Sequence, residues 1–451
     1  MAGLQVTNWF GDLVSHPQVI VEPNSVDDII AVLKDPKKYP SPVRAVGSNH
    51  STSPCGAADG GTLIKMTMYM NKILDIAADS VTAQAGALYI DVGHELESHQ
   101  LQFYVNTEIG SLSVGSAACA GTKDGSMPGE YGQVSSYVTR VKMVLPSGEL
   151  LEVGEDQPDL LQKIRSSYGT FGIVYEATLR VRPIQPMAVY HETFGLDDFV
   201  SKLPDLWARN ESMMYYLFPF EDLITVEFRK YNPGATGNPA RHVWQLRNFM
   251  WANAGPRFCH EVEATISNPT IRYKAIDDFC ALWRFKLVHL IKGDYTIATD
   301  QTIRYPAVSN DARYTFSLWA FPEERYASIL PKYFQFCKDY YRQKGYRTNM
   351  LNVGYRILKD QESLLSYSYD GNVMTIDPVS TANPGWHTFL ADYNVFCSNL
   401  GGQMLLNQTY GVTRAYAEAS LGDRLKTFAD ARKQYDPQNR LLNAYFKDLV
   451  E

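Results

Sequence analysis

Short apolar runs alternate with amphipathic segments through the first 183 residues, and this pattern predicts strands alternating with helices. Ser25 and Asp28 form a capping-box pair just before an apolar stripe, which predicts the start of a helix. A turn is indicated at residues 146–148, which read Pro-Ser-Gly. The expected strands are 17–23, 43–47, 62–66, 81–86 and 173–183, with a hairpin over 137–153 and helices over 25–35, 88–100 and 160–165.

Longer elements are predicted in residues 183–395, where helical periodicity and strand alternation occur in separate blocks. We expect a helix followed by a hairpin in 205–231 and a strand followed by a helix in 314–344. Two strands joined by a loop are expected in 351–378. Such an order is typical of an α+β domain.

Glycine and aromatic residues divide the chain of 451 residues into two unlike parts. Residues 1–182 hold 18 of the 31 glycines, whereas residues 183–451 hold 44 of the 56 aromatic residues. Glycine allows a ligand to approach the backbone closely, and aromatic side chains make bulky walls. The division favours a cofactor-binding part followed by a part that encloses a substrate; two ordinary domains of different fold are the alternative.

Charge and composition exclude several classes of protein. The formal net charge is −7 and no long basic run occurs, which argues against a nucleic-acid partner. No run of about 18 apolar residues is present, so we expect no transmembrane helix. The N-terminal residues lack the features of a secretory signal and the six cysteines form no CxxC pair, so we expect a cytoplasmic protein with free thiols.

Two loops rich in small residues are the strongest chemical signal. One is Val46-Gly-Ser-Asn-His-Ser51, directly after a predicted strand, and the other spans residues 109–126. Such runs leave backbone N–H groups free to converge on phosphate oxygens. Neither loop reads GxGxxG or GxxxxGK[ST], so neither a Rossmann site nor a P-loop is indicated. No histidine pair has the spacing of metal ligands, and we expect no metal.

The order of these and other segments resembles the vanillyl-alcohol oxidase / p-cresol methylhydroxylase superfamily, nearest its L-gulonolactone oxidase / alditol oxidase branch. The matching segments are residues 8–11, 46–51, 59–61, 85–87, 120–122, 145–149, 168–174, 435–437 and 442–445. The resemblance implies an α+β fold with a two-subdomain, non-Rossmann FAD-binding domain in 1–182. It further implies a cap or substrate domain in 183–395 and a C-terminal segment, 396–451, that returns to close the FAD site.

The same resemblance implies FAD as cofactor and assigns residues to it. The first loop is expected at the pyrophosphate and the second between the pyrophosphate and the isoalloxazine ring. The implied cofactor residues are Gly47, Ser48, Asn49, His50, Ser51, Ser111, Val114, Gly115, Ser116, Gly121, Thr122, Gly172, Val174, Asn443 and Tyr445.

In many relatives the histidine at the position of His50 is bonded covalently to the flavin 8α-methyl carbon, and we expect the same here. Imidazole with an ordinary pKa of about 6.5 is mostly neutral, and therefore nucleophilic, at pH 7. The alternative is that His50 only hydrogen-bonds the cofactor. Cys55 and Cys119 do not match a second, cysteinyl attachment position and are interpreted as packing residues.

Three departures from the family concern the substrate side. Relatives read Gly-Thr-His-Gly where this chain has Lys123 after Gly121-Thr122; this lysine is either a charge near the cofactor or a solvated surface residue. Relatives carry a Glu-x-Arg pair on one strand, and this chain keeps only the arginine, Arg356. Strand alternation places Arg356 on the same face of that strand as Asn352. A Pro-His-Trp-x-Lys-like segment is replaced by one in which Gln408 stands for the lysine.

These departures predict the candidate catalytic residues Arg356, Gln408 and Asn352, with a structural ion pair as the alternative role of Arg356. A site that reads several hydroxyls needs several charged or paired polar groups. The loss of the charged groups that relatives carry at these positions, together with the aromatic excess of residues 183–451, favours a flatter and more apolar substrate than a sugar acid.

The function that follows from the resemblance is an FAD-dependent oxidoreductase, expected to be an oxidase. It would transfer hydride from a small-molecule C–H bond, as in an alcohol or amine, to flavin N5 and pass electrons to O2. Two alternatives stay open: a flavoprotein of the same fold with a net non-redox reaction, such as cyclisation or group transfer, and a non-catalytic protein with a degenerate FAD site.

Overall fold

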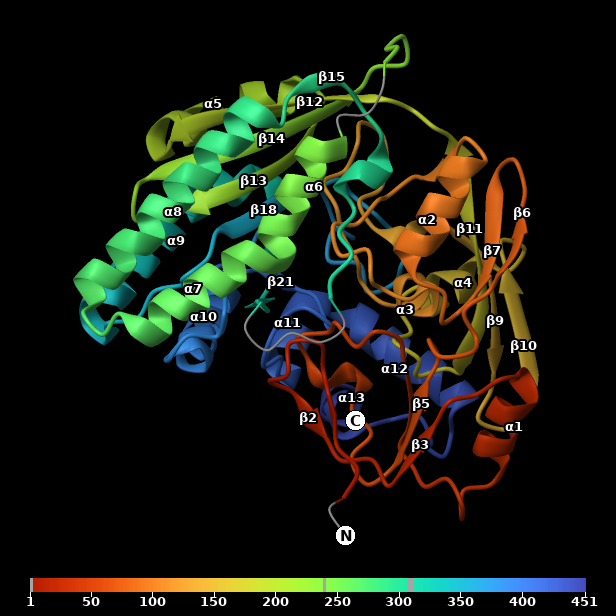
Figure 1. Cartoon of the computed structure of the whole chain (residues 1–451). Coiled ribbons are helices and arrows are strands. Elements are labelled where there is room, and N and C mark those ends of the chain that lie inside the picture. The colour runs from red at the N-terminus through yellow and green to blue at the C-terminus, as the bar shows by residue number, and fades with distance from the viewer. Residues whose placement is uncertain (1–2, 238–240, 307–311) are drawn as a thin grey trace.

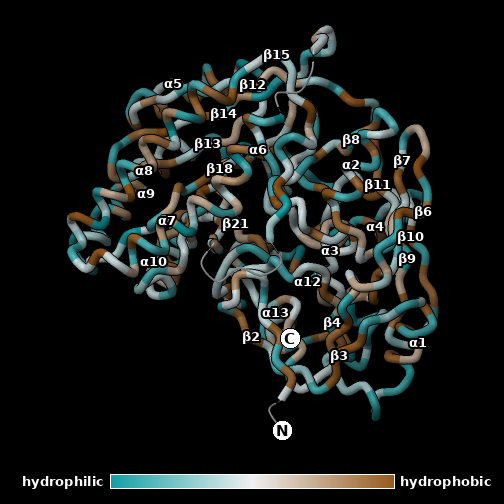
Figure 2. The backbone as a smooth tube through the Cα atoms, viewed as in Figure 1, coloured by the Kyte–Doolittle hydropathy of each residue, from teal (hydrophilic) through white to brown (hydrophobic). Residues whose placement is uncertain are grey.

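The computed structural model describes residues 3–237, 241–306 and 312–451, and the fold is given for these. Two lobes lie side by side: one carries the N-terminal strands together with the last helices, and the other is built on a large sheet covered by helices (Figure 1). Apolar positions gather in the strands inside the lobes, whereas hydrophilic positions prevail on outer turns and helices (Figure 2).

The N-terminal lobe contains two main sheets. A parallel sheet has the order β3-β5-β4, formed by Val19–Val21, Thr62–Lys65 and Val43–Val46. An antiparallel sheet has the order β10-β9-β11-β7-β6, with β8 paired to the far end of β11. Its strands are β6 (Ile73–Ile76), β7 (Ser80–Gln84), β8 (Leu101–Phe103), β9 (Val138–Val144), β10 (Leu150–Gly154) and β11 (Ile173–Pro183).

Helices of this lobe begin where the sequence predicts them. Ser25 caps helix α1 (Val26–Lys34), and the reciprocal bond from Asp28 completes the predicted capping box. The other helices are α2 (Tyr89–Ser98), α3 (Val114–Cys119) and α4 (Pro158–Ile164), and the C-terminal α11 (Arg414–Leu421), α12 (Asp423–Tyr435) and α13 (Ala444–Val450). Most predicted strands and helices of residues 17–183 are thus confirmed, whereas β6, β8 and α3 are additions.

The second lobe is an eight-stranded sheet in the order β15-β12-β14-β13-β18-β19-β17-β21. The strands are β12 (Met187–Gly195), β13 (Ser212–Phe218), β14 (Leu223–Tyr231), β15 (Gly293–Thr296), β17 (Trp319–Pro322), β18 (Asn352–Ile357), β19 (Val373–Ile376) and β21 (Gln403–Met404). The hairpin expected in 205–231 and the strand pair expected in 351–378 are confirmed. Two short ribbons, β1-β2 (Val6–Thr7, Val14–Ser15) and β16-β20 (Thr315–Phe316, Val379–Ser380), complete the strands described.

Helices cover both faces of the large sheet. One face packs against α5 (Leu196–Ala208), α9 (Glu323–Lys344) and α10 (Trp386–Asn399). The other meets α6 (Arg241–Phe249), α7 (Gly255–Thr265) and α8 (Pro269–Leu290), with a π-helical turn over Met250–Ala254. In β13, Tyr215 belongs to the first of these cores and Tyr216 to the second, as strand alternation requires.

Candidate active site

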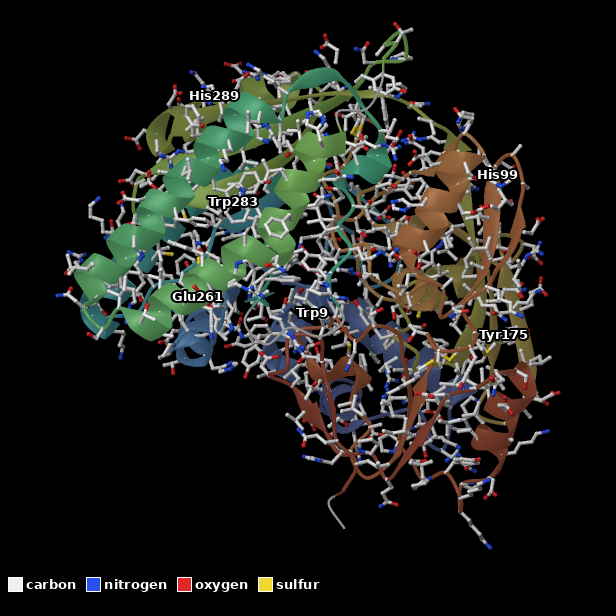
Figure 3. All side chains as sticks on the ribbon, in the orientation of Figure 1. Trp9, His99, Tyr175, Glu261, Trp283 and His289 are labelled. Carbon is white, nitrogen blue, oxygen red and sulfur yellow. The ribbon has the colours of Figure 1, made fainter. Side chains whose placement is uncertain are left out.

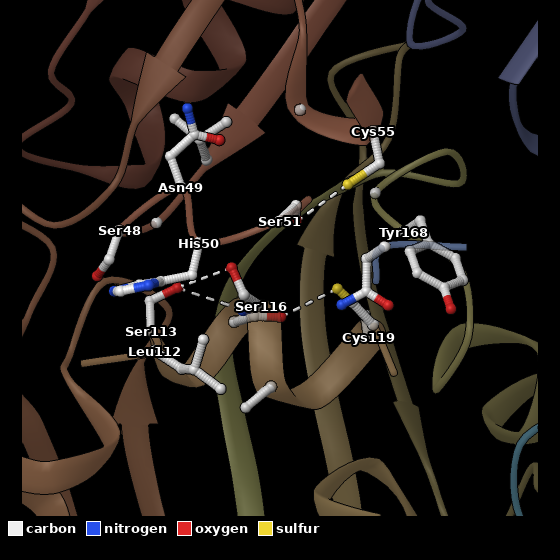
Figure 4. A pocket seen from close by; sticks show the side chains of 18 of the residues that line it. Ser48, Asn49, His50, Ser51, Cys55, Leu112, Ser113, Ser116, Cys119 and Tyr168 are labelled. Carbon is white, nitrogen blue, oxygen red and sulfur yellow. Dashed lines mark hydrogen bonds between the residues drawn. The ribbon is translucent and has the colours of Figure 1, made fainter. Parts of the chain in front are cut away.

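The two small-residue loops meet at one cavity between the sheets of the N-terminal lobe (Figure 4). The loop after β4 supplies residues 47–51, and α3 with its preceding turn supplies Ser113, Gly115 and Ser116. The loops are pressed together: a Cβ on Gly47 would lie 2.0 Å from Ser113 Oγ. Ser48 Oγ also donates to the carbonyl of Ser111 at 2.5 Å, which joins the loops directly.

His50 occupies one side of this cavity with its ring against Trp9. The ring centroids lie 5.0 Å apart with an interplanar angle of 23°. Burial lowers the pKa of His50 to about 3, so the imidazole is neutral at pH 7. Trp9 itself lies at the junction of the lobes (Figure 3), where its indole N–H donates to the carbonyl of Pro306 at 3.0 Å.

Most predicted cofactor residues line this cavity, and the others support its wall. The lining members are Gly47, Ser48, Asn49, His50, Ser51, Gly115, Ser116, Thr122, Gly172 and Val174. Ser111 lines the neighbouring groove, Val114 is buried in α3, and the carbonyl of Gly121 accepts a bond from Asn407 Nδ2 at 2.8 Å.

The predicted C-terminal pair, Asn443 and Tyr445, holds the wall from behind. Asn443 Nδ2 donates to the carbonyls of Pro54 and Ala57 at 3.0 and 2.9 Å, and its Oδ1 caps α13. The Tyr445 hydroxyl donates to the carbonyl of Leu406 at 2.7 Å. The last helix is thereby attached both to the 3-10 turn Pro54–Gly56, which follows the first small-residue loop, and to the segment that carries Gln408.

Both cysteines of this region are buried and free. The Cys119 thiol donates to the carbonyl of Gly115 at 3.0 Å, and burial raises its pKa to about 11. The Cys55 thiol lies 3.2 Å from Ser51 Oγ. A protonated thiol that packs inside α3 fits the interpretation of Cys119 as a packing residue.

Sequence reasoning missed the neighbouring group Arg44, whose guanidinium also lines the cavity. It donates to the carbonyls of Cys55, Tyr168, Gly169 and Leu441 at 2.5–3.2 Å. Burial lowers its pKa to about 10, which leaves it charged at pH 7. An arginine inside a strand of alternating apolar residues gives no sequence signal for such a role.

A second cavity adjoins the first at the junction with the large sheet. Both cavities are lined by Ile109, Leu112, Thr122, Phe316 and Gln408. Aromatic side chains form much of the remaining wall of the second cavity: Trp251 follows α6, Tyr314 precedes β16, and Tyr355 lies on β18. The Tyr355 hydroxyl donates to Glu108 Oε2 at 2.9 Å, so it is held against the N-terminal lobe.

Lys123 lines the second cavity and is buried, with 7% of its side chain exposed. Its Nζ lies 2.7 Å from Asp377 Oδ2 and donates to Gln408 Oε1 at 3.1 Å. The rings of Phe316 and Tyr355 lie 5.3 and 5.1 Å from it. The interpretation of Lys123 as a solvated surface residue is therefore wrong, because the ion pair and the aromatic rings compensate its burial.

Of the three predicted catalytic residues, only Gln408 lines these cavities. Asn352 donates to the Tyr333 hydroxyl of α9 at 3.1 Å, and Arg356 forms an ion pair with Glu323 at the start of α9. The alternation along β18 is as predicted, but this face packs on α9. The opposite face, with Val353 and Tyr355, meets the cavity, so the structure replaces Asn352 and Arg356 as candidates and gives Arg356 its alternative, structural role.

Metal-binding clusters and membrane-spanning helices are both absent from residues 3–237, 241–306 and 312–451. No group of three or more His, Cys, Asp or Glu in these ranges is placed to hold a metal ion. No helix in them is both long and apolar enough to cross a membrane.

Family profiles match most of the chain. Residues 17–154 match an FAD-binding domain, and residues 177–449 match D-arabinono-1,4-lactone oxidase. With the fold, these matches define a member of the vanillyl-alcohol oxidase / p-cresol methylhydroxylase superfamily of FAD-binding proteins, as the sequence predicts. Within it, the chain belongs to the D-arabinono-1,4-lactone oxidase family.

Curated relatives carry related names. An L-gulono-1,4-lactone dehydrogenase from Mycobacterium tuberculosis is 25% identical over 218 residues, 48% of this chain and 50% of that protein. A D-arabinono-1,4-lactone oxidase from Candida glabrata is 28% identical over 267 residues, which cover 58% of this chain and 49% of that protein. In both matches the aligned chain spans about half the length of the relative. An L-gulonolactone oxidase from Scyliorhinus torazame is 20% identical over 99% of this chain and 98% of its own.

Solved structures show the same fold at low identity. A cholesterol oxidase from Brevibacterium sterolicum has a TM-score of 0.76 at 16% identity, covering 100% of this chain and 97% of that chain. A solvent-stable cholesterol oxidase has a TM-score of 0.75 at 16% identity, covering 100% and 98%. The predicted α+β architecture with an FAD-binding fold is therefore confirmed.

Proposed function

We propose that the protein is an FAD-dependent oxidase that oxidises a hydrogen-bearing carbon of a small molecule and uses O2 as electron acceptor. The observation that carries the proposal is the pair of adjoining cavities, one lined by the two small-residue loops and the other by aromatic side chains. The first fits a cofactor and the second a substrate, and the residues they share bring the two into contact. The relatives' names, lactone oxidases and dehydrogenases, agree with this reaction class.

The residues of the first cavity fit FAD. Its loops carry small side chains and a backbone packed so closely that Gly47 has no room for a Cβ, which suits a ligand bound through main-chain N–H groups. The neutral imidazole of His50 is the nucleophilic form needed for a bond to the flavin. We propose that His50 forms that covalent bond. When bound, FAD accepts the hydride from the substrate and passes its electrons to O2.

The chain's own residues would bind and orient the substrate and exclude water from it. The aromatic wall of the second cavity, with Trp251, Tyr314, Phe316 and Tyr355, suits a flat apolar body better than a polyol. Although relatives are named for gulonolactone and arabinonolactone, we propose a substrate of the flatter kind here.

The proposed division of the chain follows the sheets. The N-terminal lobe corresponds to an FAD-binding domain in 1–182, and the eight-stranded sheet to a cap domain in 183–395. Residues 396–451 would close the FAD site; Asn443 and Tyr445 support this through their bonds to the cavity wall. Strand β21 at the start of this segment remains paired with β17 of the large sheet.

The test is an anaerobic screen of the purified protein with aromatic and aliphatic alcohols, amines, lactones and polyols. We expect a yellow protein whose absorbance near 450 nm is bleached by at least one flat alcohol or amine and returns with peroxide when air is admitted. A colourless protein under all conditions would contradict the flavoprotein proposal. Efficient turnover of xylitol or gulonolactone alone would overturn the substrate class.

The covalent bond is tested separately. After acid denaturation and gel electrophoresis, the protein band should fluoresce, and His50→Ala should remove that fluorescence. His99→Ala, at an exposed helix end, serves as the matched control. A wild-type band without fluorescence would show that His50 only contacts the cofactor.

A further inference from the structure

Lys123 and Asp377 form the one lysine–carboxylate pair among the residues lining the second cavity. They come from different lobes: Lys123 follows α3, and Asp377 follows β19. The backbone of Asp377 is fixed by two hydrogen bonds with Val353, at 2.8 and 3.0 Å. The exposed fractions of the two side chains are 7% and 1%, so the pair is removed from bulk water.

The loop that carries Lys123 is anchored on its other side. Arg229 of β14 donates to both carboxylate oxygens of Asp124, at 2.9 and 2.8 Å. Arg229 also donates to Glu227, which in turn contacts His191 at 3.0 Å. Lys123 is thus held between a buried charge network of the large sheet and the cavity.

The pair has unused hydrogen-bonding capacity inside the cavity. Asp377 Oδ1 is buried and accepts no hydrogen bond of good geometry among the described residues; the Thr375 hydroxyl is the further polar group that acts on this carboxylate and lowers its pKa. Lys123 Nζ has three N–H donors and uses two of them, toward Asp377 Oδ2 and Gln408 Oε1, within the described part of the chain. A buried unpaired acceptor is destabilising, so a ligand that supplies a donor there gains affinity.

A hydroxyl group is the ligand that can bind both the acceptor Asp377 Oδ1 and the remaining N–H donor of Lys123. Its O–H can donate to Asp377 Oδ1 while its oxygen accepts from Lys123. A carboxylate would bring a second negative charge next to Asp377, and a ketone or ether has no O–H to give. The rings of Phe316 and Tyr355 lie beside the lysine. Among the other polar side chains that line the cavity, Glu108 already accepts from the Tyr355 hydroxyl and Gln408 from Lys123, so the pair is the polar point that we assign to a substrate hydroxyl.

We propose that Lys123 and Asp377 bind the hydroxyl of an alcohol substrate and that Asp377 Oδ1 is the base for its oxidation. This inference rests on the proposed FAD-dependent activity. In the step, the O–H bond breaks and its proton moves to Asp377 Oδ1. The oxygen's electron pair becomes the second bond of C=O, and the C–H bond breaks with its two electrons passing as hydride to the FAD oxidant. The product is an aldehyde or ketone, and Lys123 stabilises negative charge that develops on the oxygen.

The electrostatic setting agrees with this role. Burial raises the pKa of Asp377, and the charge of Lys123 opposes that shift. Burial likewise lowers the pKa of Lys123, against the effect of Asp377. The titratable groups that face the pair are Asp124, Tyr215, Tyr326, Tyr355, Tyr367 and Tyr393. Burial raises the pKa of each of these tyrosines, so none of them titrates near pH 7.

Binding without turnover gives the first test. The probe is 2-phenyl-2-propanol, which has no hydrogen on the hydroxyl-bearing carbon, compared with its methyl ether, both titrated calorimetrically into the flavin-loaded protein. We expect the wild type to prefer the alcohol by about tenfold and Asp377→Asn and Lys123→Met to lose most of that preference. Glu323→Gln removes an ion pair on the α9 side of β18 and is expected to keep it. Equal preference in wild type and both variants would overturn the proposal.

Turnover gives the second test, with the best alcohol found in the anaerobic screen. Asp377→Asn should lower kcat/KM by about 100- to 10,000-fold and remove the rise of kcat/KM with pH that the wild type shows. Should a single variant fail to fold, Lys123→Met/Asp377→Leu replaces the buried pair by apolar groups, which proteins often tolerate. This double variant should bind flavin and the ether probe normally and lose the alcohol preference and turnover.

The two proposals fail in different ways. If no compound of the anaerobic screen bleaches the flavin but the alcohol probe still binds through Lys123 and Asp377, the oxidase proposal falls and the binding role stands. If alcohols are oxidised with the wild-type pH profile in Asp377→Asn, the oxidase proposal stands and Asp377 is not the base.

Discussion

At the scale of single residues, the active-site candidates divide into those that the sequence reveals and those that only the fold reveals. Gly47, Ser48 and His50 stand in a local motif, and the structure places them together on one cavity wall. Lys123 and Asp377 are far apart in the sequence; Lys123 stands in the second small-residue loop, but Asp377 lies in no recognisable pattern. Their pairing depends on how the two lobes meet, so no local rule could have found it.

The stack of Trp9 on His50 makes a testable prediction about flavin attachment. Trp9 fixes the ring plane of the imidazole, and a stacked aromatic pair contributes about 0.5–1.5 kcal/mol beyond its buried area. We expect Trp9→Leu to fold but to lower the rate of covalent flavin attachment, by up to about tenfold. The measurement is gel fluorescence of denatured samples taken at intervals after apoprotein is mixed with FAD.

A matched substitution separates stacking from general destabilisation. Tyr314→Leu removes a ring that contacts Trp9 edge-on, with the ring centroids 6.3 Å apart, and leaves the stack of Trp9 on His50 in place. Attachment in Trp9→Leu at the wild-type rate, or an equal loss in both variants, would argue against a specific role of the stack.

At the scale of elements, alternation along β18 was predictable but its orientation was not. Period-2 spacing groups Asn352 with Arg356 correctly, yet the sequence does not say whether that face meets a cavity or a helix. Helix α8 shows a different limit. Its exposed apolar residues Ile271, Leu282 and Phe285 blur the helical stripe, so the pattern of residues 269–290 does not predict this helix.

The buried ion pairs of Glu227 with Arg229 and His191, on β14 and β12, are expected to make the stability of the large sheet depend on acid pH. Burial alone would raise the pKa of Glu227, but Arg229 and His191 outweigh it and lower that pKa to about 2. The ordinary value of 4.5 applies to the unfolded chain, so this stabilisation is complete above about pH 5 and is lost as pH falls toward 2. We expect Glu227→Gln to lower the free energy of unfolding at pH 7 by about 3 kcal/mol, measured by urea titration, and to flatten its dependence on acid pH.

Glu192→Gln on the neighbouring strand β12 is the control. Glu192 pairs with Arg209 at the partly exposed edge, where an ion pair contributes about 0–1 kcal/mol. If both variants lower the free energy of unfolding at pH 7 by the same amount, the buried network around Glu227 does not stabilise the protein more than the exposed ion pair does.

At the scale of the whole molecule, the two lobes share the walls of both cavities. Phe316 precedes the large sheet's β17, whereas Ile109 and Leu112 belong to the N-terminal lobe, and all three line both spaces. Composition predicted this division of labour in outline, since glycines gather in the first part and aromatics in the second. The fold class could be predicted because it rests on the order of many motifs along the chain, and this order is visible in the sequence without knowledge of the tertiary packing.

Shared walls predict that flavin stabilises the molecule as one unit. A ligand at about 1,000 times its dissociation constant contributes about 4 kcal/mol, which corresponds to a rise in Tm of roughly 4 °C for 451 residues, because the entropy of unfolding grows with chain length. We expect His50→Ala, stripped of FAD by dialysis, to unfold at a lower temperature than the same variant with FAD restored. Calorimetry showing that only one of two transitions responds would indicate that the lobes unfold independently.

The bonds from Asn443 and Tyr445 to the cavity wall also constrain when the cofactor can enter during biosynthesis. The site needs Gly47 from the start of the chain and Gln408 near its end, with the last helix holding the segment beside Gln408 in place. A nascent polypeptide on the ribosome therefore lacks a finished flavin site until Tyr445 has emerged. Yellow colour in a cell extract would thus count only chains that were synthesised at least through this residue and folded.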